Sequence, residues 1–261
     1  MRIKQTVLGL VLCIWALQTF SFAQDKTPQA YRGSKEKLHV YLLIGQSNMA
    51  GRAPYTESES LPIDRCYLLD NSGEWEPASN PLNRYSTIRR DISMQKMNPG
   101  YSFSQTMLEI DKEIALGLVV KAKGGSKIEE WAVASKFYRE ALRRVTQAQK
   151  TGTLKGILWH QGEANVADPD KYIDKLIELV ARFRKDLDMP ELPFIAGQID
   201  NVPSINDQTA MLPDRLPFTG FVSSEGLEIF EEEHFDATSV KLMGKRYAEE
   251  MLKIQTSPKT E

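Results

Sequence analysis

Cysteine and histidine are scarce in this chain of 261 residues, which contains two cysteines and three histidines. Cys13 falls in a predicted export signal, so the mature protein would keep only Cys66 and could form no internal disulfide. No cysteine or histidine spacing resembles a metal-binding motif, and we expect neither a metal nor another cofactor. The length is sufficient for one α/β domain that is stabilised by its hydrophobic core alone.

The chain also lacks an excess of positive charge. It has 33 lysines and arginines against 35 aspartates and glutamates, and a formal net charge of −2. The basic residues are scattered, and the only conspicuous charge run is the acidic one at 231–233. We therefore expect no nucleic-acid partner and no binding to an anionic membrane surface.

The N-terminus has the pattern of a secretory signal. Arg2 and Lys4 precede an apolar stretch at 7–20, and small residues before Gln24 form a cleavage site. This pattern predicts a signal peptide over residues 1–23 and a secreted or periplasmic protein. The apolar stretch is short for a membrane span, although a retained N-terminal anchor is the alternative. The polar residues 24–37 are predicted to be a flexible leader.

From Leu38 onward, apolar segments alternate with amphipathic ones. The strands are expected at 38–45, 116–122, 154–160, 193–199 and 218–223, and the helices at 102–114, 133–149, 169–187 and 237–254. Near-continuous apolar character is typical of parallel strands that are covered on both faces. The pattern predicts an α/β domain over 38–256, with a three-layer α/β/α architecture and a doubly wound, mainly five-stranded parallel sheet.

Two aspartates mark predicted helix starts, and one segment interrupts the alternation. Asp168, followed by Pro169, and Asp236 are expected to be N-caps. Residues 52–100 include a predicted hairpin around 71–73 and irregular stretches that are rich in Asn, Pro and Arg. This insertion follows the first strand directly and is expected to form a wall of the substrate site.

The end of the first strand carries a candidate nucleophile. The apolar run at 40–44 leads into Gly45-Gln46-Ser47-Asn48, which places a hydroxyl at the C-terminal edge of the predicted sheet. Ligands bind at this edge in open parallel sheets. Ser47 can be an activated nucleophile if a histidine and a carboxylate reach it. The alternative is that Ser47 only caps a short helix.

His234 is the best candidate for the base, because it lies in an acidic loop just before the last predicted helix. A catalytic histidine needs an acceptor that holds its ring. Glu231, three residues upstream, can fold back toward Nδ1, whereas Asp236 is better placed as an N-cap. The alternative is that His234 is an ordinary surface histidine.

Two further strand ends offer donors for an oxyanion. Gly124 and Gly125 follow the second long strand, and Gln161 follows the third. Glycine N–H groups can approach a ligand closely, and a glutamine amide is a neutral donor. The alternatives are a tight turn for the glycines and a hydrogen-bonded structural role for Gln161. Taken together, these features point to acyl transfer.

These residues lie in motifs that resemble those of a known family. The chain is similar over 38–251 to SGNH-type esterases of the sialate O-acetylesterase-like group and to family-six carbohydrate esterases, which include acetyl xylan esterases. The resemblance rests on the segments at 45–51, 98–103, 124–131, 159–164, 197–198 and 234–236. It implies an SGNH hydrolase fold of flavodoxin-like topology.

The resemblance also implies roles for individual residues. Ser47 would be the nucleophile and His234 the base, and the oxyanion hole would combine the Ser47 N–H, an N–H of Gly124 or Gly125, and the Gln161 side chain. The family's acid is usually an aspartate three residues before the histidine, and here Glu231 stands at that position. Substrate contacts are expected from the following residues: Gln46, Asn48 and Trp131.

The expected function is therefore a metal-independent carbohydrate O-acetylesterase that acts through an acetyl-enzyme on an acetylated carbohydrate. One alternative is an SGNH esterase acting on a non-carbohydrate ester, which exposed apolar residues in the 52–100 wall would favour. Another alternative is a carbohydrate-binding pseudoenzyme with a weakened triad. The residues do not indicate which acetylated sugar is the substrate.

Overall fold

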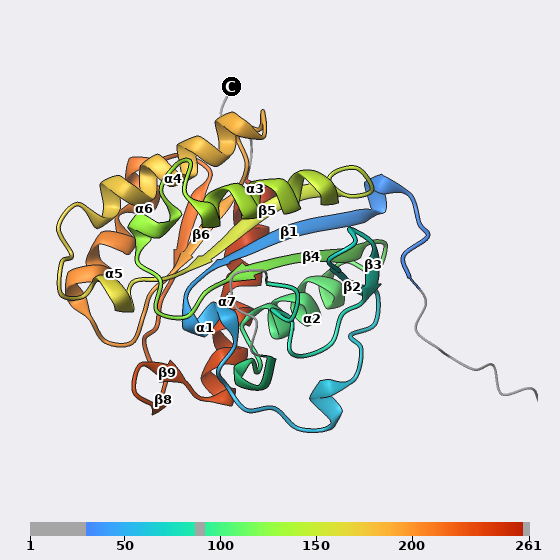
Figure 1. Ribbon diagram of the computed structural model, residues 1–261, viewed down its shortest axis with the longest axis horizontal. Coiled ribbons are helices and arrows are strands. Elements are labelled where there is room, and N and C mark those ends of the chain that lie inside the picture. Colours follow the sequence, from blue (N-terminus) through green and yellow to red (C-terminus); the bar gives the residue numbers. More distant parts are fainter. Residues whose placement is uncertain (1–29, 87–91, 258–261) are drawn as a thin grey trace, which may run out of the picture.

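A central sheet organises the protein, whose computed structural model describes residues 30–86 and 92–257. The predicted signal peptide at 1–23 lies outside the described residues. The strand order is β3-β2-β4-β1-β5-β6-β7, and only the β2–β3 pair is antiparallel (Figure 1). The strands are β1 (Leu38–Gly45), β2 (Cys66–Leu69), β3 (Trp75–Pro77), β4 (Ala115–Ala122), β5 (Thr153–His160), β6 (Phe194–Gly197) and β7 (Thr219–Val222).

All five predicted parallel strands are present, but the sheet is wider than predicted. The predicted hairpin forms as β2 and β3, yet β2 also pairs in parallel with β4. Cys66 and Leu68 of β2 are each only 1% exposed, so this strand is part of the core. The prediction of a separate insertion was wrong here, because a four-residue strand gives too short an apolar pattern to reveal its partner.

Helices cover both faces of the sheet, which confirms the three-layer α/β/α architecture (Figure 1). One face carries α2 (Gly100–Ile110) and α7 (Ala237–Thr256), and the other carries α3 (Lys136–Ala148), α4 (Tyr172–Asp186), α5 (Pro203–Ala210) and α6 (Leu212–Arg215). The shorter elements are α1 (Ser47–Ala50), η1 (Lys35–Lys37), η2 (Ser58–Ser60), η3 (Ile92–Met94), η4 (Ile128–Trp131), η5 (Glu163–Asn165), β8 (Ile229–Glu231) and β9 (His234–Phe235). Among the described residues, no helix is both long and apolar enough to cross a membrane.

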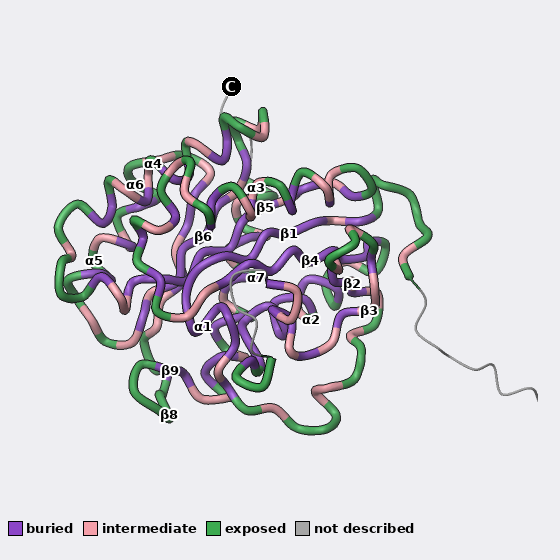
Figure 2. The backbone as a smooth tube through the Cα atoms, in the orientation of Figure 1, coloured by how far each residue is buried: buried purple, intermediate pink, exposed green. Residues whose placement is uncertain are grey.

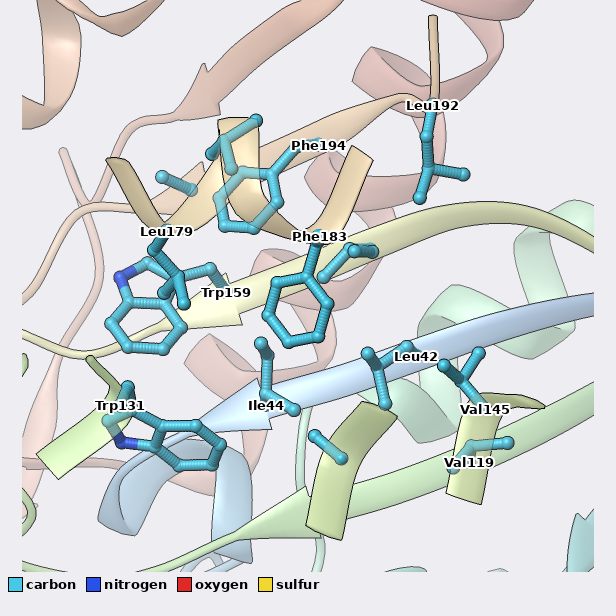
Figure 3. Packing of buried hydrophobic residues seen from close by; sticks show 14 of the residues in the cluster. Leu42, Ile44, Val119, Trp131, Val145, Trp159, Leu179, Phe183, Leu192 and Phe194 are labelled. Carbon is cyan, nitrogen blue, oxygen red and sulfur yellow. The ribbon is translucent and has the colours of Figure 1, made fainter. Parts of the chain in front are cut away.

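Successive side chains of β1 divide the core into two layers. Leu42 and Ile44 pack toward α3 and α4 in a cluster that includes Trp131 and Trp159 (Figure 3), whereas Tyr41 and Leu43 pack toward α2 and α7. The alternation follows from the period of two of a β-strand. The strands are buried along most of their length, and exposed residues concentrate on the outer helix faces and loops (Figure 2).

The two predicted N-caps have different outcomes. Asp236 caps α7 as predicted, because its Oδ1 accepts a hydrogen bond from the Ser239 N–H at 2.7 Å. The prediction for Asp168 was wrong, since α4 begins only at Tyr172. Lys171 has a φ of 61°, in the left-handed region, and this conformation separates the preceding turn from the helix.

Candidate active site

The three strands at the centre of the sheet bring the predicted site segments together. Gly45, the last residue of β1, pairs with Ala122 of β4 on one side and His160 of β5 on the other. Hydrogen bonds continue past the strands, from the Lys123 N–H to the Gly45 carbonyl at 3.0 Å and from the Gln46 N–H to the His160 carbonyl at 2.8 Å. The loops that follow β1, β4 and β5 are therefore neighbours at one edge, as the sequence predicted.

Ser47 is the first residue of α1 and is only 4% exposed. Its Oγ is buried and has no hydrogen-bond partner among the described residues. The N-cap position of α1 is Gln46, so the alternative that Ser47 caps this helix is wrong. A buried hydroxyl without a structural hydrogen bond is unusual in a folded protein and is available for chemistry.

His234 lies in β9 and faces the acidic strand β8. Glu231 is directly opposite His234 in the β8–β9 pair, across a turn in which Glu232 has a φ of 51°. Opposed residues of an antiparallel pair project their side chains to the same face. His234 is 3% exposed, which excludes the surface-histidine alternative, and its Nδ1 is buried without a hydrogen-bond partner among the described residues.

The surroundings of His234 favour its neutral form. Burial is the main cause that lowers its pKa, and the positive charge of Arg52 lowers it further. The carboxylates of Glu233 and Glu231 act in the opposite direction but do not offset these effects. An uncharged imidazole at neutral pH is able to accept a proton, which a general base must do.

The backbone at the edge offers donors for an oxyanion. The N–H groups of Ser47, Gly124 and Gly125 donate no hydrogen bond to another described residue. Gly125 has a φ of +68°, and a Cβ added there would meet no atom within 4 Å. The three N–H groups follow the neighbouring ends of β1 and β4, where the sequence analysis predicted an oxyanion hole.

The side chain of Gln161 does not have the predicted freedom to bind an oxyanion. It is fully buried, and its Nε2 lies within hydrogen-bond distance of three acceptors: Gln46 Oε1 at 3.1 Å, the Ser126 carbonyl at 3.1 Å and Asn165 Oδ1 at 2.7 Å. A side-chain amide has only two N–H hydrogens, and these partners occupy them. In this structure Gln161 connects the loops after β1, β4 and β5.

The predicted substrate contacts are also buried. Gln46 is 1% exposed, and its Oε1 accepts hydrogen bonds from the N–H groups of Gly162 and Ala164 at 3.3 and 3.2 Å. Trp131 is fully buried and stacks edge-on against Trp159 in the core (Figure 3). In this structure neither residue presents a surface that a sugar could touch, and their predicted substrate contact stays a prediction.

Asn48 is likewise only 1% exposed, so its predicted substrate contact is not supported either. Its Nδ2 donates to Glu163 Oε1 at 2.8 Å and to the Glu233 carbonyl at 3.0 Å, and its Oδ1 accepts from the Phe235 N–H at 3.2 Å. Proximity to the nucleophile in sequence did not imply contact with solvent, because α1 turns this side chain into the protein.

A pocket of about 250 Å³ lies beside the acidic hairpin and is lined by Arg52, Ser93, Met94, Lys96 and Glu231. The sequence analysis placed the substrate wall in 52–100 but did not single out Met94 or Lys96, for which no local pattern exists. A larger cavity of about 490 Å³ surrounds His39 at the opposite, N-terminal edge of the sheet and does not include the candidate catalytic groups. Among the described residues, no cluster of three or more His, Cys, Asp or Glu side chains could hold a metal ion.

A second histidine and a carboxyl group are buried behind the nucleophile. His160 Nε2 lies 4.0 Å from Glu163 Oε1, and the side chains are 0% and 6% exposed. Burial lowers the pKa of His160 to about 4 and raises that of Glu163 to about 7. Both groups therefore favour their uncharged forms around pH 6.

A mostly parallel, doubly wound sheet with Ser47 directly after its central strand β1 and His234 in β9, just before the last helix, is the arrangement expected of an SGNH-type esterase. The chain matches the family model described as carbohydrate esterase, sialic acid-specific acetylesterase, over residues 37–253, and it belongs to this family. It is accordingly an acetylesterase-type hydrolase.

Individual relatives agree with this assignment. The Arabidopsis thaliana protein named Probable carbohydrate esterase is 31% identical over 221 residues, which cover 73% of this chain and 80% of the relative. The X-ray structure of an Arabidopsis thaliana protein superimposes with a TM-score of 0.75 at 25% identity, covering 84% of this chain and 98% of that one. The crystal structure of NanS has the same fold, with a TM-score of 0.68 at 15% identity over 86% of this chain and 99% of that one.

The buried pair of His160 and Glu163 should make the stability of the protein depend on pH in two opposing ways. Between about pH 4.5 and 7, Glu163 binds more protons in the folded state than in the unfolded state, so its contribution to the free energy of unfolding falls as the pH rises. Between about pH 4 and 6.5, His160 binds fewer protons in the folded state, so its contribution to the free energy of unfolding rises with pH. In Glu163→Gln the free energy of unfolding should rise from pH 4.5 to 6.5 relative to wild type, with a slope of up to about 1.4 kcal/mol per pH unit.

His160→Gln should show the reverse, with a free energy of unfolding that falls from about pH 4.5 to 6.5 relative to wild type. Urea unfolding at half-unit pH steps measures both slopes. Parallel pH profiles for wild type and both variants would contradict the assigned protonation states.

Proposed function

We propose that this protein hydrolyses acetyl esters on carbohydrates through an acetyl-enzyme formed at Ser47. His234 removes the proton from Oγ as the hydroxyl attacks the acetyl carbonyl, and the N–H groups of Ser47 and of Gly124 or Gly125 stabilise the resulting oxyanion. Collapse of this intermediate releases the sugar hydroxyl, which takes the proton from His234. Water then attacks the acetyl-enzyme with the same base and releases acetate.

One observation carries this proposal: the buried Ser47 hydroxyl has no structural hydrogen bond and lies at the same sheet edge as the free glycine N–H groups. The segment that carries His234 is attached to the same short helix, because Asn48 bonds to Glu233 and Phe235 on either side of it. Nucleophile, base and oxyanion donors thus come from segments that are directly connected.

Glu231 is proposed to be the acid that orients His234. It lies opposite His234 in the hairpin, and Nδ1 has no other partner among the described residues. Asp236, the alternative acid, already accepts a hydrogen bond from the Ser239 N–H as the cap of α7. A modest rotation of an exposed glutamate would bring its carboxylate to Nδ1 when substrate excludes water.

The substrate class is an acetylated carbohydrate, and the pocket beside Glu231 is proposed to hold its sugar. Arg52 and Lys96 are cationic, and neither makes an ion pair with another described residue. Such a pocket suits a sugar with a carboxylate, in agreement with the sialic acid named in the family description. Acetate release from acetylated sialic acid and from acetylated xylo-oligosaccharides would distinguish an acidic from a neutral sugar.

Hydrolysis of a non-carbohydrate ester is the second candidate function, because apolar side chains are exposed in the segment 52–100. Leu61 is 61% exposed, Ile92 55% and Met94 42%, and Met94 lines the pocket beside Glu231. These residues could contact a longer acyl chain or an apolar alcohol. Faster turnover of 4-nitrophenyl butyrate than of any acetylated sugar would favour this candidate.

The protein is also proposed to be exported, with cleavage before Gln24 and a final location outside the cell or in the periplasm. The support is the basic start, the apolar stretch and the small residues at 21–23. N-terminal sequencing of the protein from the growth medium or periplasm should return Gln24, and an intact Met1 would contradict export by cleavage.

Ser47→Ala should abolish release of acetate from acetylated sugars and from 4-nitrophenyl acetate. Loss of a triad nucleophile costs on the order of a million-fold in kcat, and His234→Ala should be comparably severe. His39→Ala is the matched control, because His39 lies at the opposite edge of the sheet and should keep near wild-type kcat. Substantial activity in Ser47→Ala would refute the esterase mechanism.

Glu231→Gln and Asp236→Ala should separate the acid from the helix cap. Glu231→Gln should lower kcat with little change in stability, because Glu231 is exposed and a glutamine cannot stabilise the imidazolium. Asp236→Ala should lose about 1 kcal/mol of stability, the usual effect of removing an N-cap, with a smaller loss of kcat. Urea unfolding and kcat are measured for both, with Asp236→Asn as the control that retains the cap. A catalytically dead Asp236→Ala beside a nearly normal Glu231→Gln would reverse the assignment.

A further inference from the structure

The hairpin that carries His234 is packed through one strand only, because both residues of β9 are buried and Phe235 lies in the core against His160. β8 and β9 form a separate two-stranded sheet that does not pair with the main sheet (Figure 1). All three residues of β8 are exposed, as are Glu232 and Glu233 of the turn (Figure 2). An isolated two-stranded hairpin is only marginally stable in water. The position of His234 relative to Ser47 therefore depends on the contacts that β9 makes with its surroundings.

Asn48 supplies such contacts on both sides of His234. Its Nδ2 donates to the carbonyl of Glu233, and its Oδ1 accepts from the N–H of Phe235. A side-chain amide bonded in this way takes the place of a backbone partner in a β-ladder. Because Asn48 directly follows Ser47 in α1, these two bonds connect the segments of the proposed base and the proposed nucleophile.

Glu163 anchors the same amide from a third segment. Its Oε1 accepts the second Nδ2 hydrogen of Asn48 at 2.8 Å, and its side chain is only 6% exposed. Both Nδ2 hydrogens of Asn48 are then occupied, one by the base segment and one by the loop after β5. Removal of Glu163 would leave a buried N–H without a partner and the amide free to rotate.

We propose that Asn48 is a positioning residue for the base, and that Glu163 acts on catalysis through Asn48 rather than by touching the substrate. The proposal rests on the proposed function, in which His234 activates Ser47. It explains why Asn48 is buried although it adjoins Ser47, and why the carboxyl group of Glu163 is buried beside it.

Kinetics on two substrates separate positioning from substrate contact. Asn48→Ala should lower kcat about 100-fold, because a displacement of about 1 Å in a catalytic group has an effect of that size, and KM should change little. The loss should be equal for 4-nitrophenyl acetate, which has no sugar, and for xylose tetraacetate. A rise in KM confined to xylose tetraacetate would show instead that Asn48 binds the sugar.

The role of Glu163 is tested by conservative rescue and by a double-mutant cycle. Glu163→Ala should lower kcat, whereas Glu163→Gln keeps an acceptor for Asn48 and should retain a kcat close to wild type. Adding Glu163→Ala to Asn48→Ala should cause no further loss, since Glu163 would act only through the missing amide. Additive losses, or a Glu163→Gln as impaired as Glu163→Ala, would overturn the assignment to Glu163.

Hydrogen exchange tests the two hydrogen bonds of Asn48 to Glu233 and Phe235, which we call the clamp, without relying on catalysis. The Phe235 N–H should exchange faster in Asn48→Ala and Glu163→Ala than in wild type and Glu163→Gln, while the Asp236 N–H, which bonds to the Glu228 carbonyl, should be less affected. Asn206→Ala is the matched control, because the Asn206 side chain also makes two buried bonds to backbone, but both are at Ile199 and neither reaches α1 or the β8–β9 hairpin. It should change neither kcat nor the exchange of Phe235.

The two readouts distinguish failure of the clamp from failure of the proposed function. Unchanged exchange at Phe235 in Asn48→Ala would refute the clamp whatever the kinetics. Faster exchange in a protein whose wild type hydrolyses neither ester would support the clamp as a structural device and refute the esterase on which its catalytic role depends.

Discussion

Parallel pairing of β1 with β4 on one side and β5 on the other is the constraint on which the site depends. It brings the chain segments after Gly45, Ala122 and His160 to the same edge of the sheet. Each strand is nearly fully buried and closely packed by helices on both faces, so the register cannot shift without moving core side chains across the sheet. The geometry of the loops is thus determined by the core beneath them.

The edge above this core is polar and buried, and several of its side chains form hydrogen bonds with one another. Gln46, Gln161 and Asn165 form a connected set of amide hydrogen bonds beneath the nucleophile. Buried amides that lack partners are costly, so they adopt few alternative positions once the network has formed. This network ties the residue before α1 to the loops after β4 and β5, and the hydroxyl of Ser47 is one of several buried groups at this edge, with Gln46 Nε2 and Gln161 Oε1, that have no partner among the described residues.

The base is held differently from the nucleophile. Ser47 begins α1, two residues after the central strand β1, whereas His234 lies on a hairpin whose first strand is exposed. Its ring is kept neutral by burial and by Arg52, against the carboxylates of the acidic turn. In the proposed mechanism this neutral ring would accept the proton of Ser47 and pass it to the leaving group, and would then accept a proton from water.

The sequence by itself determined the layers, the strands that carry the site, and the candidates Ser47, His234 and the two glycines. Apolar periodicity and strand-end position depend on local pattern, which the sequence contains directly. Only the tertiary structure decided that β2 joins the sheet, that α4 begins at Tyr172, and that Gln46, Asn48, Gln161 and Trp131 are buried. The physical reason is that a side chain's direction and burial depend on what packs against it, here residues up to 187 positions away, as in the bond between Asn48 and Phe235.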